Sequence, residues 1–297
     1  MSLASGMAAL HLEMTDMVPR TEYSAPFHPA LVKAVTGYDV KPDSDGELVN
    51  KAAGAFMEAW DFALQWRVGL LSDVFGKYRV NMGHAEYAAG GVDRDDHIYC
   101  AFRDEEDVLR FDPMEAFGPV DVREWTKKFS DDYHAASLIT SDTVNMTGTY
   151  ITCVSGLIEL FGWDLLLTAA GVDPQGFGEV ANRYARWMQP YYEALAQCDS
   201  PTIMVHDDIV WTEGSFIHPD WYRTFVFPHY KTFFAPLLEA GKKILFTSDG
   251  NYTMFLDDIA QAGAQGFVLE PVTDLETAVE KYGKTHVIVG KIGRAHV

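Results

Sequence analysis

The second half of the chain alternates short apolar runs with longer segments in which apolar positions recur at helical spacing. The apolar runs, each typical of a buried strand, cover residues 201–205, 244–246, 266–269 and 286–289. Strands joined by single helices predict a parallel sheet with the helices outside it, either closed into an eightfold barrel or open and doubly wound. In both architectures, ligands bind at the carboxyl ends of the strands.

Cap residues mark the ends of the helical segments. Asp173 followed by Pro174 is typical of an N-cap and a first helical residue, so we expect a helix from there to about Cys198. Thr273 and Glu276 have the spacing of a capping box, which predicts another helix start near the C-terminus.

Acidic side chains follow the predicted strands. The residues after the first three runs are His206, Asp207 and Asp208, then Thr247, Ser248, Asp249, Gly250 and Asn251, then Glu270. Carboxylates in one cleft raise one another's pKa, which can keep one protonated as a general acid, or they bind a cation. An Asp at a strand end also commonly caps the next helix, so both interpretations stay open for Asp249 and for the Asp207–Asp208 pair.

Three other residues at these exits carry functional hypotheses. His206 lies beside two carboxylates, which would raise its pKa. Gly250 indicates a positive φ or a close backbone approach. Asn251 can donate and accept hydrogen bonds to a polar substrate, or cap the helix that follows.

The first half of the chain is less regular. Residues 78–100 combine His84 with paired glycines and a charged run, which is typical of a hairpin or a long excursion. The apolar stretch 150–171 contains Glu159 and Asp164. A membrane span would have to bury both charges, so we expect a core helix there.

Composition narrows the class of protein. The 297 residues are 48% hydrophobic, and 23 basic against 43 acidic side chains give a net charge of -20. A surface this negative repels phosphates and anionic lipid, so we expect no nucleic-acid or membrane partner. Three separated cysteines without a Cys-x-x-Cys pair, and no evident signal peptide, predict reduced thiols and a cytoplasmic protein. Dinucleotide, P-loop, serine-hydrolase-elbow and His-Glu-x-x-His motifs do not occur.

Several segments are similar to those of one family. They are DMVPRTE at 16–22, GHAE at 83–86, IMVHDDI at 203–209, GSFIHPD at 214–220, FPHYK at 227–231 and KILFTSDGN at 243–251. On these segments the chain resembles the uroporphyrinogen decarboxylase superfamily over most of its length. The resemblance implies an α/β fold, a (β/α)8 TIM barrel, as a single domain over residues 1–297. It also implies one of two activities: cofactor-free decarboxylation of uroporphyrinogen, or zinc-dependent methyl transfer involving a corrinoid protein.

Departures from the family patterns discriminate between these activities. The decarboxylase holds substrate carboxylates with several early arginines, whereas the matching region here offers only Arg20. A polyanionic tetrapyrrole would also be repelled by an acidic cleft. Methyltransferase branches supply zinc with a His-x-Cys pair where this chain has Thr247 and Asp249. A divalent metal, zinc or manganese, could instead be held by Asp249, Glu270 and His206.

Our leading hypothesis is a corrinoid-linked methyltransferase or demethylase that acts on a small methylated compound. Asp249 and Glu270 would activate the leaving heteroatom, and His206, Asp207 or Asp208 would transfer the proton. We expect Arg20, His84, Thr247 and Asn251 to contact the substrate. A uroporphyrinogen decarboxylase without cofactor is the alternative, and a non-catalytic binding paralogue that docks a corrinoid protein is a second one.

The last residues carry a separate expectation. Residues 292–297 match what a common sequencing adapter encodes in one reading frame, which predicts a non-native tail there. The barrel would then be truncated before its last strand and helix.

Overall fold

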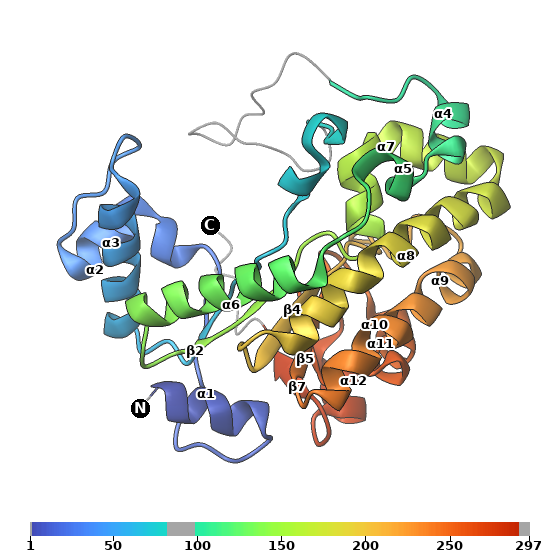
Figure 1. Ribbon diagram of the computed structural model, residues 1–297. Helices are drawn as coiled ribbons and strands as arrows, with labels where there is room; N and C mark the ends of the chain where they lie inside the picture. The colour runs from blue at the N-terminus through green and yellow to red at the C-terminus, as the bar shows by residue number, and fades with distance from the viewer. Residues whose placement is uncertain (1, 82–98, 291–297) are drawn as a thin grey trace.

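Parallel strands form the centre of the molecule, and helices cover them (Figure 1). The computed structural model describes residues 2–81 and 99–290. Five strands pair in the order β3-β4-β5-β6-β7, and β1 pairs with β2. Their bounds are β1 Leu64–Gln65, β2 Val144–Asn145, β3 Thr147–Thr149, β4 Thr202–His206, β5 Lys243–Thr247, β6 Gly266–Val268 and β7 Val287–Val289. Every strand pair is parallel, so the expected α/β class is confirmed.

Isolated bridges extend this parallel pairing beyond the named strands. Leu70, which follows β1 along the chain, pairs with Thr149 at the end of β3. Arg20 pairs with Phe62, which lies just before β1. The chain from 62 to 70 therefore runs beside the chain from 144 to 149. Among the described residues the strands do not close into a ring.

Helices connect and flank the strands. The α-helices are α1 Ser2–Leu10, α2 Pro29–Thr36, α3 Gly46–Ala59, α4 Glu105–Arg110, α5 Pro113–Phe117, α6 Val122–Ile139, α7 Val154–Val172, α8 Pro174–Gln197, α9 Pro219–Phe225, α10 Phe227–Glu239, α11 Leu256–Ala262 and α12 Leu275–Tyr282, and the short 3-10 helices are η1 Ala25–Phe27, η2 Ser72–Tyr78 and η3 Thr253–Phe255. Asp173 is the N-cap of α8, as predicted, and its carboxylate accepts the Gly176 N–H at 2.9 Å. The N-cap of α12 is Asp274, one residue after the predicted Thr273.

The two faces of each strand are both buried, which explains the continuous apolar runs. In β4, Ile203 and Val205 belong to the large core beneath the helices. Met204 points to the other face, into a smaller cluster with Leu64 and Leu245 that also contains Leu10 of α1. Successive residues of a strand face opposite sides, so residues 204, 206 and 208 share the direction of this inner cluster as long as the chain stays extended.

The apolar stretch near residue 160 is a core helix, as expected. Helix α7 is long and apolar enough to cross a membrane by length and composition, but 67% of its apolar window is buried inside the molecule. Its Glu159 is buried and lies 3.3 Å from the Arg79 guanidinium. Burial against protein is typical of the core helix of a soluble protein. The predicted excursion at 82–98 and the tail at 292–297 lie outside the described residues.

Candidate functional site

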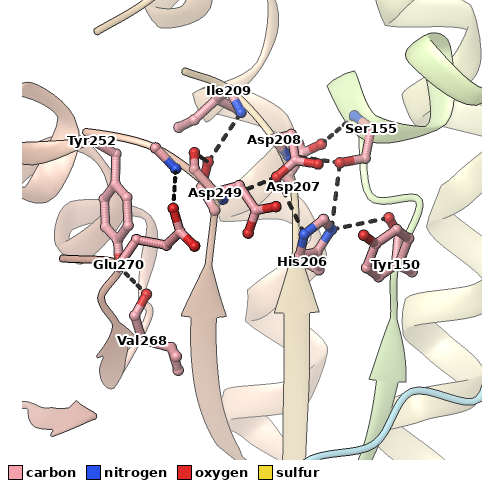
Figure 2. Close-up of polar contacts among 12 residues, drawn as sticks. Tyr150, Ser155, His206, Asp207, Asp208, Ile209, Asp249, Tyr252, Val268 and Glu270 are labelled. Carbon is pink, nitrogen blue, oxygen red and sulfur yellow. Dashed lines mark hydrogen bonds and ion pairs between the residues drawn. The ribbon is translucent and has the colours of Figure 1, made fainter. Parts of the chain in front are cut away.

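The carboxyl ends of β4 and β5 bring three of the predicted residues together. His206 Nε2 lies 3.2 Å from Asp208 Oδ1, and the same oxygen accepts the Asp249 N–H at 3.0 Å (Figure 2). One ligand atom from each of His206, Asp208 and Asp249 lies within 4.8 Å of the other two. We call these three residues the acidic cluster. His206 and Asp208 are buried, and Asp249 is exposed.

Tyr150, which follows β3, fixes the orientation of His206. The two rings stack with centroids 3.9 Å apart and planes 4° from parallel. His206 Nδ1 lies 3.3 Å from the Tyr150 carbonyl oxygen, which can only accept a hydrogen bond, so Nδ1 carries a proton. Nε2 is therefore the nitrogen that faces Asp208, 3.2 Å from its Oδ1.

The negative charge of the acidic cluster changes the pKa of His206 and of Tyr150. Burial by itself would lower the pKa of His206, but the charges of Asp208 and Asp249 and the hydrogen bond to Asp208 raise this pKa above its ordinary value. Burial, and then the same two carboxylates, raise the pKa of Tyr150, so its phenol stays protonated. The site therefore favours positive charge and disfavours further negative charge.

Asp207 lies on the opposite side of the chain from His206 and Asp208. Its carboxylate accepts hydrogen bonds from the Cys153 N–H at 3.1 Å, the Ser155 N–H at 2.7 Å and the Tyr230 hydroxyl at 2.5 Å. These amides belong to the N-terminus of α7, where a negative charge is favourable. Burial raises the pKa of Asp207 to about 6, although the three hydrogen bonds lower it. The structure thus gives Asp207 a capping position in the interior, apart from the acidic cluster.

Glu270 also lies apart from the three clustered ligand atoms. Its Oε2 accepts the Gly250 N–H at 3.2 Å, so the side chain holds the loop that carries Asp249 (Figure 2). Gly250 has φ +85, and a Cβ there would meet the Trp211 carbonyl oxygen at 2.6 Å. Only glycine suits this turn, as the sequence indicated. Asn251 Oδ1 accepts from the N–H of Thr253 at 3.2 Å and from its hydroxyl at 2.7 Å, which favours the capping interpretation of Asn251.

Of the remaining predicted substrate contacts, Thr247 lies beside the acidic cluster, because it pairs with His206 between β5 and β4, whereas Arg20 is held at Trp60. Thr247 is buried at the end of β5, and its carbonyl oxygen accepts the Asp207 N–H at 3.0 Å. The Arg20 guanidinium donates to the Trp60 carbonyl oxygen at 3.2 Å and lies over the Trp60 ring, and these contacts hold it beside the end of α3. His84 lies outside the described residues.

Two residues of the site, Tyr150 and Ser155, do not follow an apolar run that predicts a strand. Tyr150 stacks on His206, and the Ser155 hydroxyl accepts the Asp208 N–H at 2.6 Å. Both follow β3, a strand of three residues that has no long apolar run to mark it. Period-two alternation after β4 could have paired His206 with Asp208 and set Asp207 apart.

Comparisons with known proteins agree with the α/β fold. A model of the uroporphyrinogen decarboxylase (URO-D) family matches residues 126–296. A solved structure of a methyltransferase from Methanosarcina mazei superposes with a TM-score of 0.60 at 16% sequence identity, covering 97% of this chain and 81% of that chain. At this identity the likeness concerns the fold. Curated protein sequences contain no match to this chain.

Proposed function

This chain belongs to the uroporphyrinogen decarboxylase family, and we propose that it is a methyltransferase of that superfamily. The methyl group would pass between a small methylated compound and a corrinoid carried by a partner protein. The acidic cluster at the ends of β4 and β5 is the observation that supports the proposal best. The fold shared with a known methyltransferase supports the same kind of reaction.

The acidic cluster has the donor set of a divalent-cation site. One imidazole nitrogen and two carboxylate oxygens suit zinc or manganese, and three protein ligands leave a position open for a substrate atom. His206 Nε2 and Asp208 Oδ1 lie 3.2 Å apart, so a bound cation would take the place of the proton that they share. We therefore assign His206, Asp208 and Asp249 as the metal ligands. When bound, the cation would supply Lewis-acid activation of the heteroatom that loses its methyl group.

The chain's own residues have separate tasks in this proposal. Tyr150 keeps the His206 ring in place and keeps the proton on Nδ1. Asp208 holds the Asp249 backbone through one carboxylate oxygen, and Glu270 holds the adjacent Gly250 amide. Asp207 fixes the N-terminus of α7 and thereby Ser155, which lies in the first turn of that helix. These contacts preorganise the ligands, so little reorganisation is needed on binding.

We extend the proposal to the architecture and the setting. The two sheets would be parts of one (β/α)8 barrel that forms a single domain over residues 1–297. Two parallel bridges support this. Leu70–Thr149 joins the chain after β1 to β3 of the other sheet, and Arg20–Phe62 adds a further parallel segment beside the chain that leads into β1. We also propose a cytoplasmic location, with neither nucleic acid nor membrane as a partner.

A direct assay tests the reaction. Zinc- or manganese-loaded protein is mixed with cob(I)alamin and a panel of methylated amines, thiols, ethers and alcohols, and methylcobalamin formation is followed by absorbance. We expect transfer from at least one donor, and its loss in Asp249→Ala but not in Glu270→Gln. Absence of transfer from every donor with every divalent metal would overturn the proposal.

Two further measurements on the same protein distinguish the methyltransferase from the decarboxylase and from the docking paralogue. A decarboxylase would release carbon dioxide from uroporphyrinogen without metal. We do not expect this result, because Arg20, the expected anion-binding residue, is held at Trp60. A pure docking paralogue would show no stoichiometric metal, because a scaffold has no need of a preserved ligand set. Equimolar zinc with an affinity that depends on Asp249 would exclude that alternative.

A further inference from the structure

A large cavity is lined in part by Tyr150, the residue that stacks on His206. It has a volume of about 780 Å³ and is lined by residues from 23 to 31, by residues 65–68, and by Tyr150 and Met204. This volume is typical of a small-molecule site. The lining residues come from the start of α2 and the segment before it, from β1 and the residues after it, and from β4 and the residue after β3, so parts of the chain that are distant in sequence form the cavity.

Two residues connect the cavity with the acidic cluster. Tyr150 lines the cavity and stacks on His206 with ring centroids 3.9 Å apart. Met204 lines it as well and precedes His206 by two residues on β4, so the two side chains leave the strand on the same face. A molecule in the cavity would therefore contact Tyr150, whose ring also stacks on His206.

The lining is mostly aromatic and aliphatic. Tyr23, Phe27, Trp66 and Tyr150 contribute rings, and Val68 and Met204 contribute aliphatic and thioether groups. Rings of this kind favour a flat apolar guest, which they contact by stacking or by their edges. The cavity chemistry is thus unlike the hydrogen-bonding surface that a sugar or a phosphate requires.

Two lining residues of the cavity can carry a positive charge, and both have partners: Arg67 is paired with Asp132, and His28 accepts the Leu31 N–H through Nδ1. Arg67 is the arginine that lines it, and its Nε lies 3.0 Å from Oδ2 and 3.2 Å from Oδ1 of Asp132. Across Tyr150, Asp208 and Asp249 add negative charge. An anionic guest would lose its hydration without gaining a cationic partner, and it would be repelled by the acidic cluster.

We propose that this cavity binds the apolar, ring-sized part of a substrate that carries no negative charge, with Tyr150 as the wall between that part and the acidic cluster. The inference rests on the proposed methyltransferase function and specifies its substrate class. The reacting heteroatom would have to extend past the edge of the Tyr150 ring to reach the acidic cluster.

Two probes with the same methyl-substituted ring and different charge test the proposal. Binding of p-cresol and of 4-methylbenzoate to the zinc-loaded full chain is measured by isothermal titration calorimetry at pH 7.5. We expect p-cresol to bind at least tenfold more tightly. Ser24 lines the cavity from an exposed position, so Ser24→Phe projects a ring into the cavity without disturbing the core and should weaken p-cresol binding at least tenfold. Val172→Phe, at an exposed position at the end of α7, is the matched control and should leave p-cresol binding unchanged.

The outcomes are distinguishable from those of the methyl-transfer assay. Equal affinity for the two probes, no p-cresol binding, or an unaltered affinity in Ser24→Phe would overturn the cavity proposal, even if zinc binds and methyl transfer occurs. Discrimination between the probes in a protein that binds no zinc would support the cavity and count against the methyltransferase.

Discussion

Tyr150 and His206 stack face to face, with ring centroids 3.9 Å apart, while the Tyr150 carbonyl oxygen lies 3.3 Å from His206 Nδ1. One residue thus fixes both the plane and the tautomer of the imidazole. Tyr150→Leu removes the stacking ring and should lower zinc affinity about tenfold, as losses of outer-shell contacts to metal ligands do. Tyr150→Phe retains the ring and should bind zinc like the wild type. Competition with a chromogenic chelator measures both. Equal affinities in the Leu and Phe variants would mean that stacking does not position His206.

The assignment of Asp249 rather than Glu270 as a metal ligand makes opposite predictions for two acidic residues. Asp249→Ala removes one of three ligands and should reduce zinc affinity by more than ~100-fold, the upper range for an outer-shell contact. Glu270→Gln retains an oxygen that can accept the Gly250 N–H, so it should leave zinc binding nearly unchanged. Dialysis against zinc followed by metal analysis gives the stoichiometry. A large loss in Glu270→Gln would restore Glu270 to the ligand set.

Asp207 is predicted to act on stability rather than on metal binding. Asp207→Asn retains one acceptor oxygen for the three donors and should lower the free energy of unfolding by ~2 kcal/mol. Tyr230→Phe removes one of the donors and should cost ~1 kcal/mol. Urea unfolding of the two single variants and the double variant measures the coupling. Unchanged stability together with lost zinc binding in Asp207→Asn would place this carboxylate in the site instead.

Gly250 and Gly241 form a matched pair for the loop that carries Asp249. Both have positive φ, +85 and +72, but a Cβ at Gly250 meets the Trp211 carbonyl oxygen at 2.6 Å, while nothing lies within 4 Å of one at Gly241. Each alanine variant should lose ~1–2 kcal/mol from the left-handed backbone. Only Gly250→Ala must also displace the loop, so zinc affinity should fall about tenfold in that variant alone. Chelator competition on both variants decides this, and an equal effect on zinc affinity would rule out the displacement.

His229 predicts acid sensitivity of the fold at a place distant from the strand exits. Burial, and then the charge of Arg186, lower its pKa below 6.5 in the folded state, and its Nε2 lies 2.7 Å from Asn182 Oδ1. The unfolded chain therefore binds a proton more readily, and stability present above the ordinary pKa is lost as the pH falls through that value. His229→Gln should unfold with a smaller decrease in melting temperature between pH 7 and pH 5. Parallel thermal scans at these pH values check this, and an unchanged slope would contradict it.

Local pattern predicted much of the fold. The apolar runs at 201–205, 244–246, 266–269 and 286–289 correspond to β4, β5, β6 and β7, because a strand buried on both faces needs apolar residues throughout. The short strands β1, β2 and β3 left no comparable signal, since each has two or three residues. Helix starts followed local rules at Asp173. At α12 the Thr273 hydroxyl instead donates to the Gly250 carbonyl oxygen at 2.8 Å, which leaves the cap to Asp274.

By itself the sequence predicted that acidic residues and one histidine follow parallel strands, because apolar runs joined by single helices require parallel pairing. Only the tertiary structure decided what lies across from them. Tyr150 reaches His206, Asp249 reaches Asp208, and Glu270 reaches Gly250 through the register between neighbouring strands and the paths of their loops. Contacts between strands depend on packing over the whole domain, which no local pattern of residues specifies.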